Sequence, residues 1–200
     1  MAPEHTTGVE LLQAAVELLG RDARTGTVEV RGSSMLPSLR PGQRLAVEFA
    51  SGEPRRGDLL LFRQADYLAV HRLLGPARST SAGERRLRTC GDGQLGLDPP
   101  LDPARVLGRV TAVEDGGVWW SLEGFRARIY ARCLAFHDLF WAGVGVLGRT
   151  LDRGLARRRA AGPLSRLASR LDRGSLTLAH TLVFRLCHRR IARPEASTAD

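Results

Sequence analysis

The spacing of apolar side chains changes twice along the chain and predicts three segments of different structure. Apolar residues at helical spacing follow a possible capping box of Thr7 and Glu10, so residues 1–25 predict one amphipathic helix. Across residues 26–124, short apolar or alternating runs are separated by Gly- and Pro-rich turns, a pattern typical of strands. After Gly124 the apolar spacing becomes helical again.

The middle segment predicts a compact, strongly coiled, mainly β domain of roughly eight short strands. Asp115, Gly116 and Gly117 form a turn typical of a β-hairpin between two of these strands. The expected strands are the runs at 27–30, 45–49, 58–62, 67–74, 87–90, 106–114 and 118–122.

Residues 125–200 predict an α-helical extension that is rich in arginine. Residues 1–124 hold 15 arginines and 16 acidic residues, whereas residues 125–200 hold 15 arginines and 5 acidic residues. The net charge of +9 therefore belongs to the tail, which argues for a boundary near residue 124.

Three interpretations of this tail stay open. The first is a solvated helical face. The second is peripheral contact with an anionic membrane, supported by Leu139, Phe140 and Trp141 and by the leucine faces. The third is nucleic-acid binding, which fits the charge but has no recognised motif beside it, so nucleic acid is the least favoured partner. The oligomeric state is not predicted.

No export or membrane-spanning segment is expected. The N-terminus carries Glu4 before any apolar run and lacks the positive flank and apolar core of a secretory signal. The longest uncharged stretches, 139–148 and 174–184, are about half the ~20 residues that a spanning helix needs. We therefore expect a cytoplasmic protein, free or peripheral at the inner face of the membrane.

No metal or cofactor is expected. Cys90, Cys133 and Cys187 are odd in number and far apart, so they form neither a disulfide framework nor a zinc site. Free thiols of this kind are typical of a reducing compartment. The chain also lacks a Gly-rich phosphate loop of the Walker type.

Candidate chemistry centres on the segment from Gly32 to Pro37. A glycine, any residue, a serine, a methionine, any residue and a proline follow one another there. This pattern resembles the nucleophile segment of the superfamily that contains type I signal peptidases and LexA-like self-cleaving proteins. The resemblance implies a serine peptidase β-domain of that fold, with Ser34 as the nucleophile. The neighbouring Ser33 fits the register less well.

A serine hydroxyl is a poor nucleophile near neutral pH and needs an adjacent base. In the resembled superfamily, the base is a lysine or a histidine on a strand that follows a Gly-Asp dipeptide. Gly57 and Asp58 resemble that dipeptide, and His71 falls where the base would stand. Because the chain contains no lysine, the resemblance implies a histidine-type site with His71 as the base. The alternative is a half-buried strand histidine bonded to a backbone carbonyl.

The segment from Cys90 to Asp98 resembles the family's Gly-Asp-Asn segment, in which a further aspartate completes the histidine-type site. Asp98 matches that position, and the resemblance implies that it orients the imidazole and stabilises the imidazolium. Asp92 is interpreted as ordering the loop. The alternative for both aspartates is a role as turn caps.

Two positions depart from the family pattern. Many signal peptidases place a serine two residues before the nucleophile, but this chain has Gly32 there, so backbone N–H groups, chiefly that of Ser34, would stabilise the oxyanion. Gly93 stands where asparagine is usual. Either departure could mark a divergent or weakened enzyme.

Two functions of different classes remain open. One is an endopeptidase that cleaves a polypeptide substrate through an acyl-enzyme, at an extended segment with small residues before the scissile bond. The other is a catalytically inactive peptidase-like domain whose basic helical tail binds a membrane surface or nucleic acid.

Overall fold

The computed structural model describes residues 25–49, 52–64, 67–77, 84–94 and 96–155. It also describes Leu171, Thr177, Val183, Phe184 and residues 186–194. The expected N-terminal helix and most of the expected tail beyond Leu155 lie outside the described residues.

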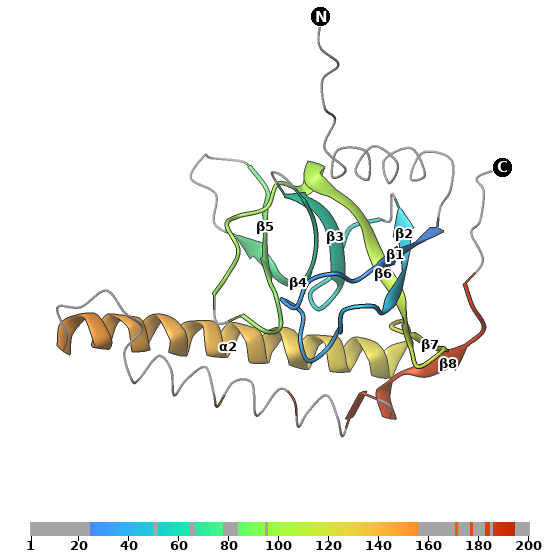
Figure 1. The fold of residues 1–200 in the computed structure, drawn as a ribbon. Coiled ribbons are helices and arrows are strands. Elements are labelled where there is room, and N and C mark those ends of the chain that lie inside the picture. Colours follow the sequence, from blue (N-terminus) through green and yellow to red (C-terminus); the bar gives the residue numbers. More distant parts are fainter. Residues whose placement is uncertain are drawn as a thin grey trace, which may run out of the picture.

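One antiparallel sheet of eight strands dominates the described part, which confirms the expectation of a mainly β fold (Figure 1). The strand order is β1-β2-β6-β3-β4-β5, and β7 pairs with both β6 and β8. The strands are β1 Thr25–Glu29, β2 Arg44–Phe49, β3 Leu59–Gln64, β4 Tyr67–Ala77, β5 Arg86–Cys90, β6 Val106–Asp115, β7 Val118–Ser121 and β8 Arg189–Ile191. A short 3-10 helix, η1 (Pro103–Arg105), precedes β6, and the helix α2 (Phe125–Leu155) follows β7.

Strand β3 is apolar on both faces because both faces of the sheet are covered there. Successive side chains of a strand point to opposite faces. Leu59 and Leu61 therefore join one buried cluster, while Leu60 and Phe62 join another. Each large apolar side chain buried in this way contributes about 1.5–3 kcal/mol relative to its exposed state. This explains why residues 59–62 show continuous rather than alternating apolar character.

The hairpin between β6 and β7 forms at the turn that its sequence predicts. Gly116 and Gly117 have φ values of 59° and 79°, both in the left-handed region that glycine adopts without strain. Two such residues in succession suit the right-handed twist of the flanking strands. Val113 and Trp120 are paired across this hairpin.

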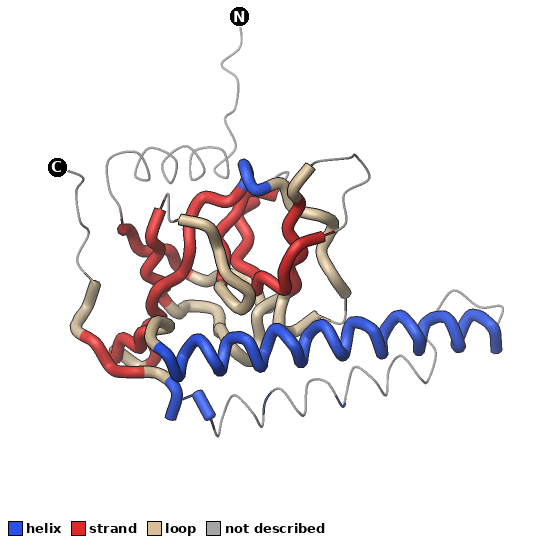
Figure 2. The backbone as a smooth tube through the Cα atoms, turned by 180° about the vertical axis from the view of Figure 1, so that it is seen from behind, coloured by secondary structure: helices blue, strands red, loops and turns tan. Residues whose placement is uncertain are grey.

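Helix α2 begins beneath the sheet, and its C-terminal end extends past the sheet (Figure 2). Ala127, Leu134 and Ala142 are buried along its inner face. The helix packs tightly against Gly57, which lies in the turn before β3 and has a φ of 97°, and a Cβ there would lie 2.7 Å from the carbonyl carbon of Ala131. Within the described ranges, no helix combines the length and the apolar character needed to cross a bilayer.

Strand β8 comes from the segment for which only helices were expected. It pairs antiparallel with β7, and Trp119 faces Ile191 in the register. A strand of three residues that contains two arginines shows no apolar alternation, so its sequence carries no strand signal. It forms because β7 offers a free edge of backbone N–H and C=O groups.

Candidate active site

Ser34 lies in the turn between β1 and β2, on a loop that is anchored by apolar side chains. Met35 and Leu39 are 3% and 2% exposed and belong to the main core cluster. The N–H of Leu39 donates to the carbonyl of Met35 over 2.9 Å, which closes one turn of chain between them. The Leu36–Pro37 peptide bond within this turn is cis. Ser34 itself stays half-buried, with its hydroxyl directed at β4.

His71 on β4 lies between Ser34 and Asp98. Its Nε2 is 3.0 Å from the Ser34 Oγ, and its Nδ1 is 2.7 Å from Asp98 Oδ2. The residue is 5% exposed. Both ring nitrogens therefore contact side chains, unlike those of the carbonyl-bonded histidine of the alternative interpretation. The three side chains form one hydrogen-bonded chain from hydroxyl to imidazole to carboxylate.

Asp98 is held in place by Thr89, at the end of β5. The Thr89 hydroxyl donates to Asp98 Oδ2 over 2.7 Å, and the Asp98 N–H donates to the Thr89 carbonyl over 3.0 Å. Thr89 is fully buried. It was not among the expected site residues, and a threonine in a short strand gives no signal of this role because β-branched residues are common in strands.

The segment from Gly91 to Gly93 packs directly behind Ser34. The N–H of Gly93 donates to the Ser34 carbonyl over 2.8 Å. A Cβ on Gly91 would lie 2.6 Å from the same carbonyl oxygen, and a Cβ on Gly93 would lie 2.9 Å from the Leu36 carbonyl oxygen. The glycine at position 93, where the resembled family usually has asparagine, thus has a steric reason in this chain.

Gly32 and Ser33, the remaining residues of the expected site, lie on the solvent-exposed side of the loop. Gly32 is exposed, and a Cβ there would meet nothing within 4 Å. Ser33 is exposed, and its carbonyl accepts a hydrogen bond from the N–H of Leu36 over 3.1 Å. The N–H of Ser34 donates to no described residue, so it is available to a ligand beside the hydroxyl.

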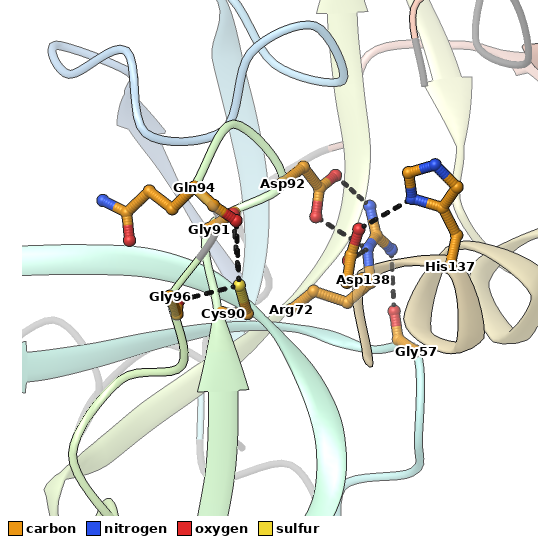
Figure 3. Close-up of polar contacts among 9 residues, drawn as sticks. All are labelled: Gly57, Arg72, Cys90, Gly91, Asp92, Gln94, Gly96, His137 and Asp138. Carbon is orange, nitrogen blue, oxygen red and sulfur yellow. Dashed lines mark hydrogen bonds and ion pairs between the residues drawn. The ribbon is translucent and has the colours of Figure 1, made fainter. Parts of the chain in front are cut away.

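Next to His71 along β4, Arg72 is buried in a cluster of charged groups (Figure 3). Its Nε donates to Asp92 Oδ1 over 2.9 Å, its Nη2 donates to Asp92 Oδ2, and its Nη1 donates to the Gly57 carbonyl over 3.0 Å. Asp138 of α2 completes the cluster, with Oδ2 3.6 Å from the Arg72 Nε. Asp92, the aspartate expected in the loop, is thus 1% exposed and paired with an arginine.

In this cluster the Arg72 guanidinium faces two carboxylates, those of Asp92 and Asp138. Burial raises the pKa of Asp138 to about 7, and the nearby Asp92 carboxylate adds to the increase. His137 and Arg72 act in the opposite direction on the same pKa. Burial also raises the pKa of Tyr130 and lowers that of His188, which lie close by. In the sequence, Asp138 stands in a largely apolar stretch of α2, but nothing there indicates that it approaches Arg72.

Cys90 shapes the loop that carries Asp92 and Asp98. Its Sγ lies 3.3 Å from the Gly91 carbonyl oxygen and 3.2 Å from that of Gly96, with the Gln94 carbonyl at 3.6 Å (Figure 3). The loop therefore curls around the buried thiol. Among the described residues, no group of three or more His, Cys, Asp or Glu side chains could hold a metal ion.

Beside His71, strand β4 pairs with a described strand on one side only. Residues 72–77 pair with β5, whereas residues 67–70 pair with β3 and with no other described strand. Unpaired N–H and C=O groups at a strand edge can accept an extended peptide as an added strand.

Comparison with models of known protein families, with curated proteins and with solved structures gives no significant match to this chain.

Proposed function

We propose that this chain is a serine endopeptidase that cleaves a polypeptide through an acyl-enzyme on Ser34. The observation that carries the proposal is the hydrogen-bonded chain from the Ser34 hydroxyl through His71 to Asp98. A nucleophile, a base and a group that orients the base are the three parts that acyl transfer by serine requires.

The first half of the reaction follows from this arrangement. The Ser34 Oγ attacks the carbonyl carbon of the scissile bond while the His71 Nε2 accepts the hydroxyl proton. Asp98 holds the other ring nitrogen and stabilises the positive charge that the imidazole gains. The free N–H of Ser34 is the backbone donor for the negative oxygen of the tetrahedral intermediate.

The second half returns the enzyme to its starting state. His71 gives the proton to the departing amine, which leaves the acyl group on Ser34. A water molecule then loses a proton to His71 and attacks the acyl carbon, so the acid is released and the Ser34 hydroxyl is restored.

An extended polypeptide suits the surroundings of His71. The edge of β4 at residues 67–70 that pairs with no described strand supports binding of the substrate as an added strand that ends beside the imidazole. The resemblance of the segment from Gly32 to Pro37 implies small residues before the scissile bond.

Labelling with a fluorophosphonate probe tests the nucleophile directly. We expect the wild-type chain to be labelled, the Ser34→Ala variant to lose labelling completely, and the Ser33→Ala variant to keep it. Mass spectrometry of candidate polypeptides, and of the protein itself, should show cleavage that Ser34→Ala lowers by about 10⁴-fold or more. Cleavage or labelling that persists in Ser34→Ala would rule out the assignment.

A further inference from the structure

The outward face of α2 carries a row of exposed apolar side chains, which we call the outer stripe. Its members follow one another at intervals of four, seven, four and seven residues, which places them on one helix face. They are Phe125, Ile129, Phe136, Phe140 and Leu147, with exposed fractions of 74%, 46%, 61%, 64% and 59%. Such a contiguous exposed row on a helix marks an interaction surface.

The outer stripe is exposed although the opposite face of α2 is packed against the protein. Ala127, Tyr130 and Leu134, on the other side of α2, are 1%, 7% and 3% exposed. The helix is therefore already docked on the protein through its inner face, and the outer stripe needs a separate partner. The packing of the described fold does not require the three exposed phenylalanines of the outer stripe.

Arginines flank the outer stripe along its first half. Arg126, Arg128 and Arg132 are exposed, and none of them makes an ion pair with a described residue. No acidic residue precedes Asp138 in this helix, and Asp138 is buried. Arg126 and Arg128 lie in the first turn, where cations oppose the helix dipole, so these two arginines do not serve the stability of α2. Their placement favours a partner with negative charge.

The combination of charge and apolar surface decides between partners. Two copies of this chain meeting through their outer stripes would bring the same arginines face to face, which is unfavourable. A nucleic-acid duplex offers phosphates but no apolar surface for five apolar side chains. An anionic bilayer offers both, with phosphates at the surface and acyl chains below them.

We propose that α2 docks through its outer stripe on an anionic lipid surface. In this arrangement the helix lies in the plane of the membrane, with the phenylalanine side chains at the boundary between headgroups and acyl chains. The flanking arginines contact lipid phosphates, and Arg56, whose guanidinium lies 5.5 Å from the Phe136 ring centre, adds a further positive charge beside the stripe. The proposal goes beyond peptidase activity and holds whether or not Ser34 is a nucleophile.

Co-flotation of the full chain with lipid vesicles tests this surface. Vesicles of phosphatidylcholine with one third phosphatidylglycerol are compared with vesicles of phosphatidylcholine alone, each at low and high salt. We expect binding to the anionic vesicles, little binding to the neutral ones, and weaker binding at high salt. The Phe136→Ser/Phe140→Ser variant should bind about tenfold or more weakly.

Matched charge variants separate the outer stripe from general basicity. Arg126→Gln/Arg128→Gln/Arg132→Gln should weaken binding strongly, whereas Arg31→Gln/Arg40→Gln/Arg105→Gln, which removes the same charge from exposed sites outside α2, should change it little. Circular dichroism and thermal unfolding verify that each variant is folded.

Three results would overturn the proposal. The first is no binding to anionic vesicles at low salt. The second is an equal loss in the two arginine variants, which would show attraction by net charge alone. The third is a change in self-association or in binding to duplex DNA in the Phe136→Ser/Phe140→Ser variant while vesicle binding stays the same.

Discussion

At the residue scale, the orientation of His71 depends on Thr89, which acts through Asp98. Asp98 Oδ2 accepts hydrogen bonds from both His71 and Thr89, so Thr89 fixes the carboxylate that fixes the imidazole. Thr89 is fully buried and the Asp98 side chain is 12% exposed, and the loss of a hydrogen bond to a largely buried carboxylate costs about 1–3 kcal/mol. Thr89 is therefore a positioning residue for His71, the proposed base.

Replacement of Thr89 by valine should slow the labelling of Ser34 while leaving the fold intact. Valine keeps the shape of the side chain but removes the donor to Asp98. We expect the rate of fluorophosphonate labelling to fall about tenfold, and Thr89→Ser, which keeps a hydroxyl, to restore most of it. A labelling rate that is equal in Thr89→Val and wild type would contradict this role.

Gly91 should tolerate no side chain. The added methyl group in Gly91→Ala would meet the Ser34 carbonyl oxygen at 2.6 Å and His71 Nε2 at 3.2 Å, so the loop that carries Ser34 must move away from His71. A Cβ on Gly96, in the same loop, would meet nothing within 4 Å, which makes Gly96→Ala a matched control. We expect labelling of Ser34 to drop by about 100-fold in Gly91→Ala and to stay unchanged in Gly96→Ala. Similar labelling in both variants would contradict the steric argument.

The sequence predicted the chemically distinctive members of this site and missed those that act through packing. Ser34 stands in a motif, and the absence of lysine left His71 as the expected base. Thr89 and Gly91 have no such distinction, because a threonine in a strand and a glycine in a turn are common. Their roles arise only when β5 and the loop after β1 come together in space.

At the scale of elements, the buried charge cluster joins α2 to the strand that carries His71. Arg72 pairs with Asp92 on the loop after β5 and approaches Asp138 on α2. The sequence could not predict this contact, since nothing in the local pattern near Asp138 indicates which strand the helix covers. The helix itself was predictable because its apolar spacing is a local property.

Asp138 should make the stability of the protein depend on pH. Its pKa is about 7 in the folded chain, compared with an ordinary value of 3.8. The unfolded chain releases this proton near pH 4 and the folded chain only near pH 7, so the free energy of unfolding should fall as the pH rises between these values. Asp138→Asn, which stays neutral, should remove this dependence and stabilise the protein at pH 8 by on the order of 2 kcal/mol.

Chemical denaturation at pH 5 and pH 8 measures this effect. The difference between Asp138→Asn and wild type isolates the effect of Asp138 from that of every other group in the protein. Glu53→Gln is the control, because Glu53 has a carboxylate whose side chain is 90% exposed. If Asp138→Asn were less stable than wild type at pH 8, the charged carboxylate would be a net stabilising partner of Arg72.

At the scale of the whole molecule, the C-terminal segment forms part of the sheet and of its packing. Strand β8 extends the sheet beyond β7, and Phe184 lies with its ring centre 6.2 Å from that of Trp120 and 6.3 Å from that of Tyr130. A boundary at residue 124 separates the charge of the chain well. It does not separate the packing, because β8 pairs with β7 across that boundary. The sequence could not predict this pairing, since long-range pairing of a short polar strand leaves no trace in local composition.

Phe184→Ala should therefore destabilise the whole fold in one cooperative transition. The ring is partly buried, stacks on His188 at a centre distance of 4.1 Å and contacts the rings of Trp120 and Tyr130, so its loss should lower the free energy of unfolding by about 2 kcal/mol. Leu186, two residues further along the same segment, is 73% exposed, and Leu186→Ala should change the stability by less than about 0.5 kcal/mol. Tryptophan fluorescence and far-ultraviolet circular dichroism during denaturation should report coincident transitions in both variants. An early, separate loss of helix in Phe184→Ala, with the strand signal unchanged, would instead show that the C-terminal segment folds apart from the sheet.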